Sequence, residues 1–384
     1  IRDRDVTGVQ TCALPISMST VLDPIKMWED LHKIPELAMQ EVKTAAYVTK
    51  TLQDLGIEVQ TGIGGTTGVM GIIKGSEPGP VVMLRADMDA LPFTIDGKEC
   101  AIHACGHDSH TAMLLAAASR LKDRVKKGTL KLLFQPAEEE ISGALAMIKA
   151  GVIDDVDYAL GAHIRPIQDV PAGQICPAVN HTASNTLRVE VTGRSAHAAR
   201  PHLGVNALDV ACAIVQGTQN MWFNPTNIWS MKATQLHADQ GATNSIPEKA
   251  VITFDCRAQT NPLMKDFRER FAKLVEGIAT GYGATATITE LGACPAAEYD
   301  EDLKQMVIES IVRTHGQEAV AKDCGGGGED FHYYKMHKPT MKAAYFGLGV
   351  GATPGLHAAT MHFDPKYLPM GVDVMVDVVE RLIG

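Results

Sequence analysis

The chain has 384 residues, of which 45% are hydrophobic, with 35 Lys and Arg against 45 Asp and Glu. This is a globular composition, long enough for two or three domains, and it excludes a disordered or collagen-like chain. A formal net charge of −10 argues against a nucleic-acid partner, because phosphate binding relies on clustered Lys and Arg. There is no run of about 18 apolar residues, so we expect no membrane span.

The eight cysteines are scattered without a CxxC pair, which indicates neither a zinc ribbon nor a disulfide framework. We therefore expect a cytoplasmic protein with reduced thiols. Residues 1–17 lack the apolar core of a signal peptide and precede a methionine that can initiate translation, Met18. We expect residues 1–17 to be a non-native leader of translated adaptor sequence; a natural disordered leader is the alternative.

The first part of the chain alternates between helix and strand patterns. Apolar residues at helical spacing between Pro24 and Leu55 predict two helices that break at Ile34-Pro35. Short apolar runs predict strands buried on both faces, over residues 69–73, 81–85, 129–135 and 157–163. Further helices are predicted over residues 109–125, with Asp108 as the cap, and 138–150. The alternation is typical of an α/β fold with a mainly parallel sheet.

After about Asn180 the order of predicted elements changes. Strands are predicted over residues 187–192, 228–237, 250–258 and 284–289, and helices over residues 205–221 and 267–280. Their order, strand-helix-strand-strand-helix-strand, is that of the ferredoxin-like split motif. We expect an inserted α+β domain, residues 181–291, within a catalytic domain formed by residues 18–180 and 292–384.

A cysteine and a histidine stand close together where a predicted helix begins. Cys105 and His107 are separated by one glycine, so both side chains can converge on one ion. Thiolate and imidazole suit zinc, manganese, iron or cobalt. Alone, such a pair is more often a buried cysteine beside a capping histidine.

Two adjacent glutamates, Glu138 and Glu139, follow the predicted strand that ends at Gln135. One carboxylate can bind a metal while the other takes a proton from the attacking water. The alternative is an acidic helix start that the helix dipole favours, an interpretation that suits Glu140.

Two more histidines complete a set of ligands. His163 follows an apolar strand pattern, and His357 follows a segment rich in Gly and Pro. Each by itself is more often a structural histidine that is hydrogen-bonded. Together with Cys105, His107 and Glu139 they supply five ligands, which is enough for two metal ions, and this combination is the specific observation.

With their neighbours, these residues resemble the dinuclear-metal amidohydrolases, which include aminoacylases, hippurate hydrolase and indoleacetyl-amino-acid hydrolases and are relatives of glutamate carboxypeptidase. The resemblance covers nearly all of residues 18–384. Its motifs recur here in family order: LRADMDALP, HACGHDSHTAMLL, FQPAEE, GAH, GRSAHAARPH, NSIP, GGEDF and LH. It implies a metallopeptidase catalytic domain with an inserted lid and dimerisation domain, and hence a homodimer or a higher homo-oligomer.

The resemblance also implies roles for single residues. The implied metal ligands are Cys105, His107, Glu139, His163 and His357. They would hold two divalent ions per subunit, zinc or manganese, with cobalt or nickel as alternatives. Glu138 would be the general base that activates the attacking water and then gives its proton to the leaving amine.

Two aspartates precede these motifs. Asp89 matches an aspartate that supports the metal centre, whereas Asp87 stands where the carboxypeptidases have a ligating histidine, so its role stays open. For both, hydrogen bonding to loop amides is the alternative.

The inserted domain and the last part of the chain hold the implied substrate contacts. His197 matches a lid histidine that reaches the site of a partner subunit and stabilises the oxyanion. Asn244 and Arg257 match residues that hold the free carboxylate of the substrate, and an asparagine in a turn and a solvated arginine at a strand end are the alternatives. Gly328, in the run 325–328, would let backbone amides approach the substrate.

The implied activity is hydrolysis of the amide bond of an N-acyl amino acid or a short peptide-like substrate. A dipeptidase or carboxypeptidase of the same family is one alternative, and a silent peptide-binding paralogue is another. Between Pro92 and Cys105 the chain is shorter than auxin-conjugate hydrolases, so their substrate preference is not carried over. Six further histidines are expected to be structural: His32, His103, His110, His181, His202 and His362.

Overall fold

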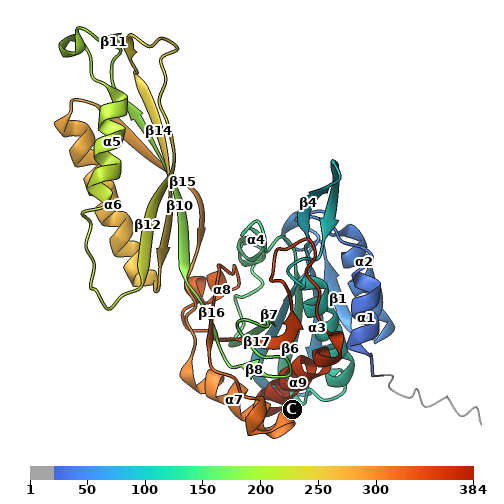
Figure 1. The fold of residues 1–384 in the computed structure, drawn as a ribbon. Helices are drawn as coiled ribbons and strands as arrows, with labels where there is room; N and C mark the ends of the chain where they lie inside the picture. The colour runs from blue at the N-terminus through green and yellow to red at the C-terminus, as the bar shows by residue number, and fades with distance from the viewer. Residues whose placement is uncertain (1–20) are drawn as a thin grey trace, which may run out of the picture.

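The computed structural model describes residues 21–384 (Figure 1). The expected leader, residues 1–17, lies outside the described residues. No helix in the described part of the chain has both the length and the apolar character needed to cross a membrane.

A seven-stranded sheet forms the centre of the larger body, in the order β1-β2-β6-β3-β7-β17-β8. Its strands are β1 (Glu58–Thr61), β2 (Val69–Lys74), β3 (Glu77–Asp87), β6 (Lys127–Gln135), β7 (Tyr158–Pro166), β8 (Ile175–Cys176) and β17 (Lys342–Ala352). The four central strands β6, β3, β7 and β17 are parallel neighbours, but the pairs β1–β2, β2–β6 and β17–β8 are antiparallel. The sheet is therefore mixed, and the parallel arrangement that we expected is limited to its centre.

Helices cover both faces of this sheet. One face packs against α1 (Pro24–Leu31), α2 (Val42–Asp54), α3 (His107–Leu121), α7 (Glu301–His315) and α9 (Leu368–Ile383). The other face packs against the short helices α4 (Gly143–Lys149) and α8 (His332–His337). Val82 and Leu84 of β3 enter the first core, whereas Met83 enters the second, so this strand is buried on both faces as its continuous apolar run predicted.

Three details near the site differ from the sequence predictions. Gly106 caps α3, and Asp108 lies in the first turn of the helix, where its carboxylate accepts from the amide of Ser109. The helix predicted from residue 138 begins only at Gly143, because Ala137 and Ile141 adopt positive φ angles of 53°. His163 lies inside β7 and does not follow it.

The smaller body is an antiparallel sheet in the order β12-β14-β10-β15. It comprises β10 (Ala183–Thr192), α5 (Ala207–Thr218), β12 (Trp229–His237), β14 (Lys249–Ala258), α6 (Asn261–Gly281) and β15 (Thr285–Cys294). This is the predicted ferredoxin-like order, and α5 and α6 cover one face of the sheet (Figure 1). Buried and less buried residues alternate along β10 because only that face is covered.

Among the described residues, three pairs of short strands lie outside the two main sheets. They are the hairpin β4 (Leu91–Ile95) and β5 (Lys98–Ile102), the parallel pair β9 (Val179–His181) and β16 (Cys324–Gly326), and the antiparallel pair β11 (Ala196–His197) and β13 (Ser245–Ile246). The pair β9 and β16 lies near the junction of the bodies, whereas β11 lies at the far end of the smaller one (Figure 1).

Candidate metal centre

The five expected metal ligands converge at the carboxyl ends of the central strands. Cys105 precedes α3, His107 begins it, Glu139 lies in the turn after β6, His163 lies in β7, and His357 lies in the loop after β17. The Cys105 thiol lies 3.4 Å from His163 Nε2. Glu139 Oε1 lies 3.4 Å from His357 Nε2 and 3.8 Å from His107 Nε2.

These ligands form two groups that share one thiol. The ligand atoms of Cys105, His107 and His163 all lie within 4.8 Å of one another, and so do those of Cys105, Glu139 and His357. Among residues 21–384, the buried atoms His107 Nε2 and Glu139 Oε1 have no hydrogen-bond partner. Buried polar atoms are normally paired, so two unpaired atoms that face one another fit a cation between them. The donor set of thiol, imidazole and carboxylate suits zinc or manganese at two adjacent positions.

Local backbone geometry brings the cysteine and histidine together. Gly106 has φ 91°, a conformation that favours glycine, and a Cβ there would lie 2.3 Å from the side chain of Ile164. The turn after β6 is fixed by Glu41, whose buried carboxylate accepts from the amide of Ala137 at 2.9 Å and from the hydroxyl of Thr67. Sequence reasoning missed Glu41, because an acidic residue before an apolar helical pattern resembles an ordinary helix start.

The two aspartates, Asp89 and Asp87, contact different neighbours. Asp89 Oδ1 lies 3.2 Å from His107 Nδ1, and its carboxylate accepts from the backbone amides of Glu138 and Glu139 at 3.1 and 3.0 Å. It therefore both contacts an expected ligand, which it would orient, and binds loop amides. Asp87 instead contacts His110 Nδ1 at 2.7 Å and accepts from Arg85 at 2.6 Å.

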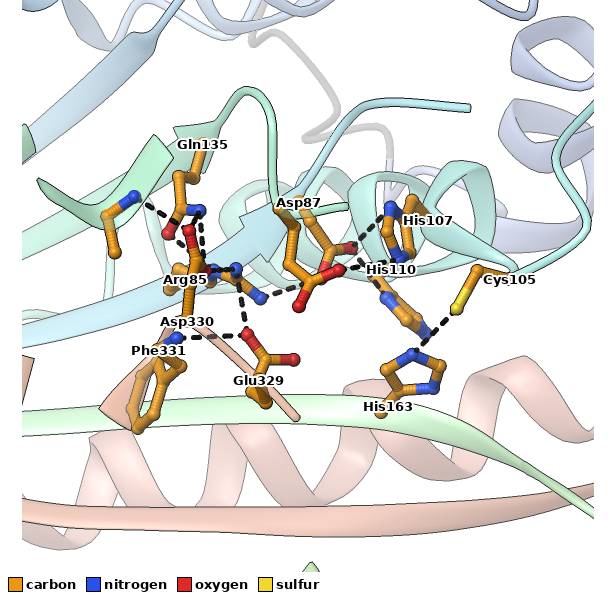
Figure 2. A network of polar contacts seen from close by, with 12 residues as sticks. Arg85, Asp87, Cys105, His107, His110, Gln135, His163, Glu329, Asp330 and Phe331 are labelled. Carbon is orange, nitrogen blue, oxygen red and sulfur yellow. Dashed lines mark hydrogen bonds and ion pairs between the residues drawn. The ribbon is translucent and has the colours of Figure 1, made fainter. Parts of the chain in front are cut away.

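A buried ionic network lies beside the metal ligands (Figure 2). The guanidinium of Arg85 donates to Asp87 and Asp330 at 2.6 and 2.7 Å, lies 3.0 Å from Glu329, and donates from Nε to Gln135 at 2.9 Å. Burial alone would lower the pKa of Arg85, but the surrounding carboxylates raise it well above its usual range. Sequence reasoning missed Arg85, although an arginine within the apolar run VVMLRAD is an identifiable anomaly.

The carboxyl groups of the site are crowded. Burial, with Glu329 and Asp330 nearby, raises the pKa of Glu138 well above its usual range, and burial also raises the pKa of Glu139. Burial raises the pKa of the Cys105 thiol as well. Burial and crowding therefore disfavour the ionised forms of these groups, and a bound cation would stabilise those forms.

A cavity of about 420 Å³ opens on four of these ligands, Cys105, Glu139, His163 and His357, and is bounded by both bodies. Arg257 and Gly328 line this cavity together with Glu138 and His357. Arg257 is half exposed and pairs with Asp255 at 3.0 Å. A larger cavity, about 790 Å³, lies between α6 and α8 and contains none of the expected ligands.

Two expected substrate contacts lie elsewhere. His197 in β11 and Asn244 before β13 are exposed and adjacent, since the amide of Ala198 donates to the carbonyl of Asn244 at 2.8 Å. Both lie at the end of the smaller body that is remote from the central sheet (Figure 1). The structure therefore does not bring them to the metal ligands of the same chain.

Several histidines that we expected to be structural have defined partners. His32 contacts Asp108 at 2.6 Å, and His110 accepts from the amide of Ile164 at 2.9 Å. His181 lines the same cavity and contacts His332 at 2.9 Å. Burial, with two nearby arginines, lowers the pKa of His181 to about 3, so this imidazole is neutral.

A profile of peptidase family M20/M25/M40 matches residues 83–381. The chain belongs to this peptidase family. This confirms the resemblance drawn from the motifs, and it makes the chain a hydrolase of the metallo-amidohydrolase and peptidase class.

Relatives within the M20/M25/M40 family cover most of the chain. An N-acetylcysteine deacetylase of Bacillus subtilis (strain 168) is 31% identical over 360 residues, which cover 90% of this chain and 92% of the relative. An N-acyl-L-amino acid amidohydrolase of Geobacillus stearothermophilus is 34% identical over 295 residues, which cover 73% and 79%.

Solved structures of the family share the fold. A dinuclear metal binding M20 peptidase of Bacillus subtilis is 28% identical, with a TM-score of 0.78, and the match covers 94% of this chain and 97% of that one. A putative aminohydrolase of methicillin resistant Staphylococcus aureus is 26% identical, with a TM-score of 0.85, covering 94% and 96%.

Proposed function

We propose that this chain hydrolyses the amide bond of N-acyl amino acids at a centre of two divalent metal ions. The observation that carries the proposal is the convergence of the five expected metal ligands, four of which line one cavity together with a second glutamate, Glu138. This cavity would be the substrate cavity. The relatives named as an N-acyl-L-amino acid amidohydrolase and an N-acetylcysteine deacetylase support the substrate class. The seven described cysteines are free, which supports a cytoplasmic enzyme.

The ligand residues would hold the ions, and the ions would supply Lewis acidity that polarises the amide carbonyl and makes water more acidic. Zinc and manganese fit the donors best, with cobalt and nickel as alternatives. Cys105 belongs to both ligand groups and would be shared by the two positions. Asp89 would keep His107 oriented toward them through its contact with Nδ1.

Glu138 would be the general base. Its carboxylate lines the substrate cavity, and Oε2 lies 3.8 Å from His107 Nε2, so it faces the same space as the ligands. It would take a proton from the attacking water and deliver that proton to the leaving amine. A buried carboxylate with a raised pKa is well matched to both transfers.

The smaller body would act as a lid over this cavity. We propose residues 181–291 as the lid and dimerisation domain, with residues 18–180 and 292–384 as the catalytic domain. Arg257 would bind the free carboxylate of the substrate through two parallel hydrogen bonds. Gly328 would let backbone amides approach the substrate. Because His197 and Asn244 lie at the remote tip, they would serve the site of a partner subunit in a homodimer or higher homo-oligomer.

The experiment that tests the proposal is a hydrolysis panel with the full chain loaded with zinc, manganese or cobalt. Acetyl, benzoyl, indoleacetyl and aminobenzoyl amino acids are compared with free-amine dipeptides and with N-acyl amino acid amides that lack the carboxylate. The proposal predicts hydrolysis of one or more N-acyl amino acids, and a lower kcat/KM for the matching amide. Faster hydrolysis of the dipeptides would assign a dipeptidase, and binding without hydrolysis would assign a silent paralogue.

A further inference from the structure

Two buried thiols outside the metal-ligand set face each other, and one of them begins a segment that reaches the substrate cavity at Gly327 and Gly328. The Sγ atom of Cys176, the last residue of β8, lies 3.2 Å from the Sγ atom of Cys324, the first residue of β16. Both cysteines are free. Cys176 is fully enclosed, whereas Cys324 is 8% exposed, so a small reagent reaches Cys324 first.

The two cysteines belong to different parts of the fold, one at the edge of the central sheet and the other in a segment that reaches the substrate cavity. Cys176 pairs with Gly347 at the edge of the central sheet, where the missing side chain of Gly347 leaves room for the sulfur: a Cβ there would lie 2.6 Å from it. Cys324 begins the glycine-rich segment 324–328, whose residues Gly327 and Gly328 line the substrate cavity. A covalent bond between the two sulfurs would therefore tie the cavity wall to the central sheet.

A neighbouring arginine favours the thiolate form of one member of the pair. Arg165 donates from Nη2 to the carbonyl of Gly325 at 3.0 Å, which places its guanidinium beside Cys324. The hydrogen bond between the two thiols and the charge of Arg165 lower the pKa of the Cys324 thiol, although burial opposes them. The same hydrogen bond, together with burial, raises the pKa of Cys176. Because Cys324 is the more exposed of the two thiols and lies beside Arg165, it is assigned as the nucleophile of the pair, and Cys176 as the thiol that resolves it.

We propose that Cys176 and Cys324 form an oxidative modification site, which closes to a disulfide when hydrogen peroxide reaches Cys324. The Cys324 thiolate attacks one peroxide oxygen, the O–O bond breaks, and the departing hydroxide takes up a proton as water. The sulfur of Cys176 then attacks the resulting sulfenic acid, the S–S bond forms, and the hydroxyl leaves with the Cys176 proton as a second water. The two thiols lose two electrons, and one peroxide is reduced to two waters.

The site is tested on the metal-loaded full chain by thiol counting and peptide mapping. After treatment with hydrogen peroxide, denaturation and alkylation, the proposal predicts that alkylated cysteines fall from eight to six. The digest should contain one linked pair of peptides, joined through Cys176 and Cys324, and dithiothreitol should separate them. Both cysteines fully alkylated after oxidation, or either one linked to a different cysteine, would overturn the proposal. This chemical measurement does not depend on the proposed substrate.

Variants separate this pair from other thiols. Cys176→Ser should stop at the sulfenic acid of Cys324, which dimedone labels, and Cys324→Ser should give neither label nor link. Cys212→Ser, at an exposed cysteine of α5, is the matched control and should keep the link. Equal dimedone labelling in Cys176→Ser and Cys324→Ser would contradict the assigned nucleophile. Unaltered thermal unfolding of each variant, without peroxide, establishes that the comparison is between folded proteins.

The link should also affect turnover, because it fixes a wall of the substrate cavity. We expect peroxide to lower the hydrolysis rate of the wild type and dithiothreitol to restore it, with no such reversible loss in Cys176→Ser. The same reversible loss in that variant would place the effect at another thiol, such as Cys105, and would contradict the coupling.

Discussion

Asp89 and His107 are joined by a contact of 3.2 Å between Oδ1 and Nδ1, which leaves the other ring nitrogen, Nε2, facing the two glutamates of the site. The same carboxylate accepts from the backbone amides of Glu138 and Glu139. One buried side chain therefore positions the expected metal ligand on α3 and both glutamates in the turn after β6.

Asp89→Asn should weaken metal binding by about 10- to 100-fold. The side-chain amide of asparagine is neutral and has one acceptor oxygen, so it cannot accept all of these hydrogen bonds. Competition with a chelator of known affinity measures the change, and circular dichroism checks that the variant is folded. Asp96→Asn, in the exposed turn between β4 and β5, is the control and should bind metal as the wild type does. Equal affinity in the two variants would contradict the role given to Asp89.

Arg85→Gln should destabilise the chain strongly, because it leaves the carboxylates of Asp87, Glu329 and Asp330 buried without their cation. Breaking a buried ion pair by removing one partner costs about 3–5 kcal/mol, whereas an exposed pair contributes about 0–1 kcal/mol. Arg124→Gln, which removes an exposed pair with Glu380, is the control. Urea unfolding checks the difference, and similar midpoints for the two variants would count against the network.

The His32–Asp108 pair predicts a pH-dependent contribution to stability. The hydrogen bond that His32 donates to the carboxylate of Asp108 raises the pKa of His32, and burial opposes this. A raised folded-state pKa means that the contribution is complete below the unfolded value, about 6.5, and is lost as pH rises through the folded value. Burial would raise the pKa of Asp108, but His103 and His32 lower it, so its contribution is lost as pH falls below about 3.9.

His32→Gln should therefore lower the unfolding midpoint most between about pH 4 and pH 6.5, and less at pH 8. The loss should stay below about 1 kcal/mol, because His32 is half exposed and its charge is screened. Thermal unfolding across this range measures it, with the exposed His202→Gln as the control. A pH-independent difference would show that the pair does not act through the imidazole charge.

Mixing two inactive variants tests the proposed role of His197 across a dimer. Neither His197→Ala nor Glu138→Gln should be active alone, since each lacks one part of every site. After subunit exchange, random pairing gives half hybrids with one complete site in two, so about a quarter of wild-type activity should return. A mixture that stays inactive after exchange has been verified by mass spectrometry, or a fully active His197→Ala variant, would contradict the proposal.

The sequence predicted the framework of the site because its ligands end or interrupt the strands of one parallel unit. The Cys105–His107 pair, Glu139 and His163 are separated from one another by whole helices in sequence, but the parallel order of β3, β6 and β7 brings them to one edge. The ferredoxin-like order of elements in the smaller body could likewise be predicted from the succession of strand and helix patterns in the sequence.

Other features could not be predicted from local sequence patterns. The contact between Arg85 and Asp330 joins residues 245 positions apart, and no local pattern indicates it. The helix predicted from residue 138 fails because Ala137 and Ile141 take positive φ angles, held by long-range contacts such as that of Glu41 with the amide of Ala137. The remote position of His197 follows from the length of the inserted strands in space, which composition and spacing do not specify.

The most direct measurement of the proposed chemistry compares Glu138→Gln with Glu140→Gln, an exposed neighbour, in metal content and turnover. Glu138→Gln should keep about two metal ions per chain and lose about 10²- to 10⁴-fold in kcat on an N-acyl amino acid, because the proton acceptor is gone. Glu140→Gln should stay close to the wild type. If Glu138→Gln, with full metal content, still turned over like the wild type, Glu138 would not be the base.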